Sequence, residues 1–310
     1  MKYPLFTIGN PPASPPRSTP ERTRRRRRIW VGALLLLLLY PLASEATETV
    51  RLQLKWEHQF QFAGYYAAQA QGYYQAAGLE VEILPSQLEE NAVQQVLQGK
   101  AEFGVGTTDL LILREQGQPV VALAVIFQHS PLALMTLKQD GIQSVHGLAG
   151  RKVMIEPEAA ELYAYLGKEG ISTKDVALVP HSLHAKDLLS GTVDAMSIYV
   201  TDEPFELKMA GQDYLLYSPR SVGIDFYGDN LFTTEQQLKL KPERVKAFRE
   251  ASLKGWVYAM ANPEEMVQLI YTQYSQRHSI EHLRFEADQM VALLRPSLIE
   301  PGHMNPGRWK

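Results

Sequence analysis

The segment Arg51–Ile83 restricts the possible fold more than any other part of the chain. It consists of an alternating apolar stretch, a loop rich in aromatic and polar residues, a helical stretch and a second apolar stretch, which predicts a βαβ unit. In open α/β sheets, ligands bind beyond the carboxyl ends of the strands. The loop at that position contains Trp56, Glu57, His58, Gln59, Phe60, Gln61 and Phe62. A binding site for a flat polar molecule is therefore the first hypothesis.

The first 46 residues differ from the rest of the chain. The arginines at 24–28 precede an apolar run over residues 29–43, and small residues follow at positions 44 and 46. This order predicts an export signal over residues 1–46 that is removed after its last residue. An uncleaved membrane anchor is the alternative. The run is shorter than the roughly 20 residues of a spanning helix, and Pro41 closes it, so removal of the segment is favoured. We expect the remaining chain to be periplasmic.

The composition of the exported part, residues 47–310, excludes several kinds of site. The signal segment holds 8 of the 31 basic and 2 of the 34 acidic residues, so 23 basic and 32 acidic residues remain, with a net charge of −9. Such a chain lacks the basic stripe that a nucleic-acid binder needs. It has no cysteine, which excludes disulfides, thiolate metal sites and cysteine nucleophiles. Its length is sufficient for two lobes of ordinary domain size.

Strand and helix patterns alternate along the exported part and restart near Gly147. Strands are expected at residues 50–54, 79–84, 103–106, 119–127, 132–137, 152–155, 176–179, 195–199 and 215–217. Helices are expected at residues 62–77, 91–98, 107–116, 159–169, 185–190, 235–238, 242–260, 263–273 and 280–294. The alternation predicts a mainly parallel sheet with helices on both faces. The restart predicts two similar lobes joined by crossover segments.

Short motifs are spread over most of the exported part: Lys55-Trp56, Gly64-Tyr65-Tyr66, Gly72-Tyr73-Tyr74, Gly78-Leu79, Phe103-Gly-Val-Gly106, Phe127-Gln-His-Ser-Pro131, Gly191-Thr-Val-Asp-Ala195 and Gly223-Ile-Asp-Phe-Tyr-Gly-Asp-Asn230. In these motifs the chain resembles the SsuA/THI5-like (NMT1/THI5) family, from about residue 50 to the C-terminus. The resemblance implies an α/β protein with the type II periplasmic binding-protein fold, in which two α/β lobes close over a central ligand cleft. Lobe I would comprise about 50–137 and 230–310, and lobe II about 138–229.

The same resemblance implies a monomeric solute-binding protein. Members bind thiamine-pyrimidine precursors, sulfonates, and nitrate-like or taurine-like solutes, and the His-Ser-Pro sequence at 129–131 is most similar to the branch near the pyrimidine binders. The expected partners are a small-molecule ligand and either an ABC permease or a membrane signalling module, because exported domains of this branch are also found fused to such modules. The stretch Gly302–Lys310 resembles an internal segment of a longer protein, which would make the chain a fragment or the product of a truncated gene.

Aromatic side chains after the first strand are candidates for stacking on a ligand ring. Trp56 directly follows the predicted strand, and an aromatic face there either stacks on a heteroaromatic ring or packs between the lobes. Tyr65 and Tyr66 are adjacent in the following helix, so at most one of them can face the cleft. We predict that Trp56 and one of these tyrosines form a ring clamp.

The turn after the strand at 103–106 offers hydrogen-bonding groups to a ligand. Gly106, Thr107 and Thr108 precede a predicted helix, and the free N–H groups and hydroxyls there suit an anion or a carbonyl. A simple helix cap is the alternative interpretation. His129 follows a buried strand at the crossover and is expected to line the hinge side of the cleft.

Acidic residues follow the strand that restarts the pattern. Glu156 directly ends this strand and is the better candidate to accept a hydrogen bond from an exocyclic amine. Glu158 and Glu161 are expected to stabilise the first turn of the next helix, where negative charge is favoured.

Further cleft residues are predicted at the end of the strand at 195–199 and at the return crossover. Tyr199 and Glu203 lie on one face by the two-residue period of an extended chain, and Asp225 or Tyr227 is expected to close the site. A carboxylate flanked by aromatic rings suits an aminopyrimidine, whereas a sulfonate needs cationic donors, and among these loops only Lys55 supplies one.

His278 and His282 share a helical face at a spacing of four residues, which can bind a metal ion. No third ligand is apparent in the sequence, so we predict a solvated pair and no metal site. No serine, histidine and aspartate in triad order and no paired-acid motif stand out, so no catalytic residues are predicted.

An enzyme is the second functional class, because eukaryotic members of the resembled family are thiamine pyrimidine synthases. They use iron and pyridoxal phosphate and consume one of their own histidines, whose position is occupied here by Phe62. Their cysteine-rich segment would fall near 223–230, and this chain has no cysteine. The sequence therefore favours a binding protein without a cofactor over a synthase in thiamine biosynthesis.

Overall fold

The computed structural model describes residues 13–14, 47–86, 91–138, 141–156, 159–182 and 184–309. The chain divides into two units, Met1–Glu45 and Ala46–Lys310, and every element described below lies in the second. The predicted signal segment therefore lies almost entirely outside the described residues. Within the described part of the chain, none of the helices combines the length and the apolar character needed to cross a bilayer.

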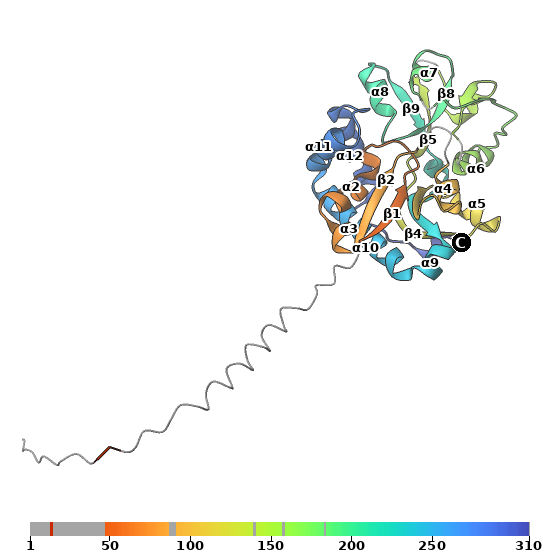
Figure 1. Cartoon of the computed structure of the whole chain (residues 1–310). Coiled ribbons are helices and arrows are strands. Elements are labelled where there is room, and N and C mark those ends of the chain that lie inside the picture. The colour runs from red at the N-terminus through yellow and green to blue at the C-terminus, as the bar shows by residue number, and fades with distance from the viewer. Residues whose placement is uncertain are drawn as a thin grey trace, which may run out of the picture. The chain divides into compact units, whose positions relative to one another are not determined.

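The second unit contains two five-stranded sheets, and we call each sheet with its covering helices a lobe (Figure 1). The first sheet has the order β2-β1-β3-β10-β4, with β1 at Glu48–Gln53, β2 at Leu79–Leu84, β3 at Phe103–Gly106, β4 at Val120–Phe127 and β10 at Gly228–Thr234. The second has the order β7-β6-β8-β5-β9, with β5 at Leu132–Leu137, β6 at Lys152–Met154, β7 at Ala177–Val179, β8 at Ala195–Tyr199 and β9 at Tyr214–Tyr217.

Each sheet combines parallel and antiparallel pairs. In the first sheet β1 pairs parallel with β2 and β3, whereas β10 pairs antiparallel with β3 and β4. In the second sheet β6 pairs parallel with β7 and β8, whereas β5 pairs antiparallel with β8 and β9. The expectation of a mainly parallel sheet was therefore wrong. The strand that enters from the other lobe runs against its neighbours in both sheets.

The expected repetition of the pattern is confirmed, because both sheets have the same strand order and the same position for the incoming antiparallel strand. One boundary differs from the expectation. The sequence predicts Leu132–Leu137 to be part of lobe I, yet β5 is a strand of the second sheet. The chain thus leaves the first lobe after Phe127 and returns to it at Gly228. We call residues 128–131 and 218–227 the first and second crossovers.

Helices from both ends of the described chain cover the first sheet. They are α2 at Ala63–Ala70, α3 at Tyr73–Ala76, α4 at Ala92–Leu97, α5 at Leu110–Glu115, α9 at Glu235–Leu240, α10 at Pro242–Ala261, α11 at Pro263–Gln273 and α12 at Ile280–Leu294, with the 3-10 turns η1 at Phe60–Phe62 and η5 at Pro306–Trp309. The second lobe has α6 at Ala160–Lys168, α7 at Lys186–Leu189 and α8 at Pro204–Met209, with η3 at Val145–Leu148, and η4 at Pro219–Val222 lies in the second crossover.

The single helix expected over residues 62–77 is divided into α2 and α3. Gly72 precedes α3 with φ +69°, a left-handed conformation that glycine adopts without the steric cost of a Cβ. The first part, α2, packs against α10 so closely that a Cβ on Gly255 would lie 2.0 Å from the carbonyl oxygen of Gly64. The buried Trp256 and Phe248 of α10 join residues of α2 and the first sheet in one core. This core fixes the loop that follows β1.

Candidate functional site

A small pocket lies where the two lobes and the two crossovers meet. Its volume is about 10 Å³, and its lining residues are Thr107, Thr108, Asp109, Ser130, Leu132, Glu161, Tyr199, Phe226, Tyr227 and Gly228. We call it the inner pocket. Its polar groups are hydroxyls and carboxylates, its flat surfaces are aromatic rings, and no lysine or arginine is among the described residues that line it. It therefore suits an uncharged ring with hydrogen-bond donors.

Four of the predicted binding residues line this pocket: Thr107, Thr108, Tyr199 and Tyr227. The Thr107 hydroxyl accepts a hydrogen bond from the backbone N–H of Asp109 at 3.2 Å and so stabilises the turn before α5. Thr108 donates its hydroxyl proton to the carbonyl oxygen of Tyr227 and so joins the β3–α5 turn to the second crossover.

Glu161 is a residue of the inner pocket that the sequence did not assign to it. It lies in the first turn of α6, as expected, yet its side chain is only 6% exposed and accepts a hydrogen bond from Ser130 of the first crossover. Burial raises its pKa to about 7, although the Ser130 hydroxyl and the Lys55 ammonium act in the opposite direction. A carboxyl group with this pKa can donate or accept a hydrogen bond near neutral pH.

Lys55 connects the two lobes beside this pocket. Its ammonium group contacts the hydroxyl of Tyr199 in the second lobe and lies 3.4 Å from Asp229 Oδ1 in the first. Gln61 donates to the other oxygen of Asp229 at 2.6 Å. Burial raises the pKa of Asp229, and the neighbouring Lys55 and Gln61 partly offset that rise. The charge of Lys55 is thus already balanced by a buried carboxylate.

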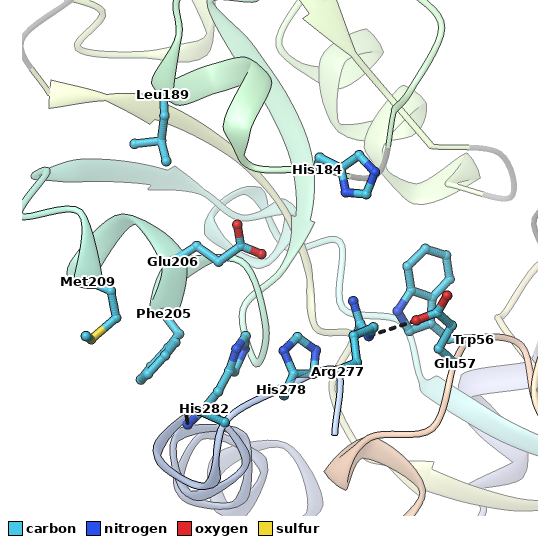
Figure 2. Close-up of a pocket in the computed structure, with 11 residues that line it drawn as sticks. Trp56, Glu57, His184, Leu189, Phe205, Glu206, Met209, Arg277, His278 and His282 are labelled. Atoms are coloured by element: carbon cyan, nitrogen blue, oxygen red, sulfur yellow. Dashed lines mark hydrogen bonds and ion pairs between the residues drawn. The ribbon is translucent and has the colours of Figure 1, made fainter. Parts of the chain in front are cut away.

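A larger pocket of about 610 Å³ also has residues of both lobes in its wall, and we call it the outer pocket (Figure 2). Its lining residues are Trp56, Glu57, His184, Leu189, Phe205, Glu206, Met209, Arg277, His278, Ser279 and His282. Trp56, predicted to stack on a ligand, faces this pocket and has the Arg277 guanidinium 6.0 Å from its ring centre. Arg277 also pairs with Glu57 at 2.9 Å.

Tyr65 and Tyr66 do not form the predicted clamp with Trp56. Both are fully buried in the core of the first lobe, and neither is among the residues that line the two pockets. Tyr65 meets Trp256 edge to face at 5.6 Å, and the Tyr66 hydroxyl lies 2.8 Å from His58 Nδ1. The physical reason is the close contact of α2 with α10, which turns this part of the helix inward.

His129 and Asp225, both predicted to contact the ligand, are paired with each other. The Nδ1 atom of His129 lies 2.9 Å from Asp225 Oδ1, so the pair joins the first crossover to the second. Arg308 donates to the carbonyl oxygen of Asp225 at 2.7 Å and to that of Gln128 at 2.8 Å, and thereby ties both crossovers to the C-terminal segment.

The remaining predicted residues lie at strand ends near the cleft. Gly106 is the buried last residue of β3. Glu156 is half-buried, and its backbone N–H donates to Ser197 Oγ at 2.9 Å. Glu203 accepts a hydrogen bond from the backbone N–H of Tyr199 at 2.9 Å. Burial, followed by the nearby charge of Asp202, raises the pKa of Glu203.

The prediction of a solvated histidine pair at the C-terminus was wrong. His278 and His282 are 6% and 4% exposed, and two buried carboxylates, Asp202 and Glu286, join them. One ligand atom from each of the four residues lies within 4.8 Å of the others. Burial raises the pKa of Glu286 and lowers that of His278. One sequence feature could have revealed this cluster: His278, His282 and Glu286 follow one another at intervals of four residues. Asp202 could not be found in this way, because it is contributed by the other lobe.

One family model and several known proteins match this chain. Residues 59–266 match the family model described as NMT1/THI5 like. The riboflavin-binding protein RibY of Chloroflexus aurantiacus is 28% identical over 238 residues, which cover 74% of this chain and 67% of RibY. A formylaminopyrimidine-binding protein of Halalkalibacterium halodurans is 27% identical over 260 residues, 77% of either chain.

An enzyme and a solved structure also match. The 4-amino-5-hydroxymethyl-2-methylpyrimidine phosphate synthase of Legionella pneumophila is 24% identical over 73% of this chain and 74% of its own. The alkanesulfonate-binding protein SsuA from Xanthomonas axonopodis pv. citri superposes with a TM-score of 0.63 at 12% identity, over 77% of this chain and 83% of SsuA. At this identity the similarity shows the fold alone, which is that of the periplasmic binding proteins.

Proposed function

The chain belongs to the NMT1/THI5-like family, and from this premise we propose that it is an exported solute-binding protein for a small heteroaromatic molecule with a pyrimidine-type ring. The observation that carries the proposal is the inner pocket, in which a buried carboxyl group, several hydroxyls and aromatic rings converge from both lobes. A binding protein of this type encloses its ligand when the lobes close. The pocket volume of about 10 Å³ means that a ring enters only when the lobes separate.

The chemistry of the lining favours a ring with N–H donors. Glu161 can accept from a ring N–H or an exocyclic amine, and Tyr199 and Tyr227 provide flat faces on which a heteroaromatic ring can stack. Riboflavin and formylaminopyrimidine, which occur in the names of two relatives, both contain a pyrimidine ring. The shared ring supports this ligand class, and within it a thiamine-pyrimidine precursor is our first candidate.

A sulfonate ligand is less compatible with this pocket. Anion recognition usually depends on arginine, lysine or several free N–H groups. None of the described residues that line the inner pocket is basic, and the nearby Lys55 is already paired with Asp229. An anion placed beside Glu161 and Asp109 would also meet like charge.

The synthase is the alternative function, because several relatives at 24% identity have that name. Two sequence features oppose it. The resemblance places the sacrificial histidine where this chain has Phe62, which is fully buried in the first lobe, and the chain has no cysteine. We accordingly propose that the protein binds its solute without a catalytic cofactor and delivers it to an ABC permease or reports it to a membrane signalling module.

A thermal-shift and calorimetry screen tests this proposal. The ligands are riboflavin, formylaminopyrimidine, hydroxymethylpyrimidine, thiamine, taurine and an alkanesulfonate. A ligand at a hundred-fold excess over its Kd raises the free energy of unfolding by about 2.7 kcal/mol. We expect at least one pyrimidine-containing compound to raise the melting temperature and the sulfonates to leave it unchanged.

Two variants locate the binding site. Glu161→Gln should weaken the pyrimidine-type ligand at least about ten-fold, because it removes a charged acceptor. Glu206→Gln, in the outer pocket, is the control and should leave the affinity unchanged. Binding of a sulfonate alone would refute the ligand class, and formation of a pyrimidine by the iron-loaded protein would refute the receptor function.

A further inference from the structure

Two histidines and two carboxylates meet at the contact between the lobes, next to the outer pocket. His278 lies just before α12, and His282 and Glu286 follow one and two helical turns later on the same face. Asp202 lies between β8 and α8 of the second lobe. All four side chains are more than nine-tenths buried. The cluster therefore combines three residues from the first lobe with one from the second.

The polar atoms of this cluster point at one another without forming a hydrogen-bond network. The Nε2 atoms of His278 and His282 and the Oε1 atom of Glu286 are buried and make no hydrogen bond within the described part of the chain. His282 Nε2 lies 2.9 Å from Asp202 Oδ1, and His278 Nε2 lies 3.5 Å from the same oxygen. Buried polar groups without partners are costly and uncommon in native proteins. An ion at the point on which they converge would satisfy all of them.

The distances fit a four-coordinate metal ion. Zinc bound tetrahedrally by nitrogen and oxygen at about 2.0–2.2 Å places its ligand atoms about 3.4 Å apart. Here Asp202 Oδ1 lies 2.9 and 3.5 Å from the two imidazole nitrogens, and Glu286 Oε1 lies 3.7 and 4.0 Å from them. Small side-chain movements would therefore bring the four atoms to a common ion.

The surroundings hold the cluster in place. The second oxygen of Glu286 accepts a hydrogen bond from the backbone N–H of Phe60 at 2.6 Å, which leaves Oε1 directed at the histidines. Phe205, also from the second lobe, stacks on the His282 ring at 4.4 Å (Figure 2). Such outer contacts are typical of metal ligands, whose orientation they fix.

The charge balance also suits a divalent cation. A bound divalent cation would be balanced by the ionised carboxylates of Asp202 and Glu286, and Arg277, which lies 3.6 Å from Asp202 Oδ2, is itself paired with Glu57. His278 and His282 line the outer pocket, which gives an ion a route from solvent.

We propose that Asp202, His278, His282 and Glu286 form a binding site for a divalent transition-metal ion, zinc being the best match to two imidazoles and two carboxylates. Because Asp202 is the only one of the four from the second lobe, the bound ion fastens the lobes together. Metal occupancy and lobe closure are then thermodynamically coupled, so each favours the other. The site does not depend on the identity of the organic ligand.

Titration of the full chain, purified without an affinity tag and stripped with a chelator, tests the site. We expect calorimetry to show one Zn²⁺ per chain and no comparable binding of Mg²⁺, which prefers six oxygen ligands. Co²⁺ should give the intense visible absorption of a four-coordinate ion. His282→Gln and Glu286→Gln should each weaken Zn²⁺ at least about ten-fold and remove that absorption.

His184→Gln is the matched control, since His184 lines the same pocket but is not part of the cluster. It should bind Zn²⁺ as the unsubstituted protein does. Circular dichroism of the stripped variants verifies that each is folded. Zinc binding that is absent, or that is equally strong in His282→Gln and in the unsubstituted chain, would overturn the proposed site.

Asp202→Asn separates binding from closure. We expect it to retain three ligands from one lobe, to bind Zn²⁺ at least about ten-fold more weakly, and to lose the decrease in radius of gyration that Zn²⁺ causes in the unsubstituted protein by small-angle X-ray scattering. A radius that does not change with Zn²⁺ in the unsubstituted chain would overturn the coupling. Pyrimidine binding by the stripped protein is measured separately, so a failure of the metal site and a failure of the proposed function are distinguishable.

Discussion

The ammonium group of Lys55 lies 3.4 Å from Asp229 Oδ1, and the two side chains are 13% and 2% exposed. Lys55 follows β1, and Asp229 lies in β10, where it has a φ of +47° that is uncommon for a residue other than glycine. The same ammonium group contacts Tyr199 of the second lobe. One buried ion pair thus lies where the sheet of the first lobe meets the second lobe.

Lys55→Met should destabilise the protein because it leaves the Asp229 carboxylate buried without its cation. Loss of one partner of a buried pair costs about 3–5 kcal/mol. Burial already raises the pKa of Asp229, and Lys55 lowers it, so the variant raises that pKa further. A raised carboxyl pKa means that stability is lost as the pH rises through the folded-state value. Urea unfolding should therefore show a larger deficit at pH 8 than at pH 5.

Lys138→Met is the control for this prediction. Lys138 is exposed and lies 3.7 Å from an exposed Asp213, and such surface pairs contribute little. We expect its free energy of unfolding to change by no more than about 0.5 kcal/mol. Equal effects of the two substitutions on the free energy of unfolding would contradict the prediction, because the Lys55–Asp229 pair would then contribute no more than a surface ion pair.

Glu161→Gln should change how stability depends on pH. The folded-state pKa of Glu161 is about 7, above its ordinary value of 4.5, so the protonated form is favoured by folding. The protonated Glu161 side chain contributes fully to the free energy of unfolding below about pH 4.5, and this contribution is lost as the pH rises through 7. At pH 8 the ionised carboxylate costs at most about 3 kcal/mol. The variant should match the unsubstituted protein near pH 4.5 and exceed it at pH 8.

Chemical denaturation at several pH values between 4.5 and 8 measures this difference. Glu206→Gln, at an exposed position of the outer pocket, should give a difference that does not vary over this range. A flat profile for Glu161→Gln would mean that Glu161 is ionised at little cost in the folded protein.

Local signals predicted many of the elements accurately. The strands at 79–84 and 103–106 and the helices at 263–273 and 280–294 have the expected bounds. Pro263 begins one of these helices, and the Ser279 hydroxyl caps the other by accepting from the His282 N–H. These features act within a few residues, so they can be recognised in a single sequence.

Properties that depend on distant parts of the chain were not predictable in this way. The antiparallel direction of β5 and β10 follows from the path between lobes, and neither strand has a local pattern that specifies its partner. Glu161 has the sequence context of a helix start, and its burial becomes evident only when Ser130 is placed beside it. Asp202 likewise becomes a neighbour of His282 only through the contact between the lobes.

Gly255→Ala and Gly167→Ala should have opposite effects although both glycines lie in helices. A Cβ on Gly255 would lie 2.0 Å from the Gly64 carbonyl oxygen and 2.6 Å from the Ala68 nitrogen, both backbone atoms of α2. We expect Gly255→Ala to cost about 3 kcal/mol or more, because α10 must move away from α2. A Cβ on Gly167 has no atom within 4 Å, so Gly167→Ala should stabilise α6 by about 0.5–1 kcal/mol.

Thermal and urea unfolding of both variants check this pair of expectations. If Gly255→Ala were as stable as the unsubstituted protein, the close contact of α2 and α10 would be incorrect. The burial of Tyr65 and Tyr66 would then lose its explanation.

Arg308→Met should loosen the crossovers between the lobes. Arg308 donates to Gln128 O and Asp225 O, one in each crossover, and its guanidinium lies 3.9 Å from the centre of the Tyr227 ring. Methionine retains much of the packing but none of the donors, so we expect the free energy of unfolding to fall by about 1–3 kcal/mol.

Amide hydrogen exchange of Arg308→Met should become faster at residues 128–131 and 218–227 and remain unchanged in α10. Arg220→Met is the control, because the Arg220 side chain is 48% exposed and pairs with Asp225 Oδ1 at 3.5 Å within the second crossover itself. Unchanged exchange in both crossovers of Arg308→Met would show that the C-terminal segment does not restrain them.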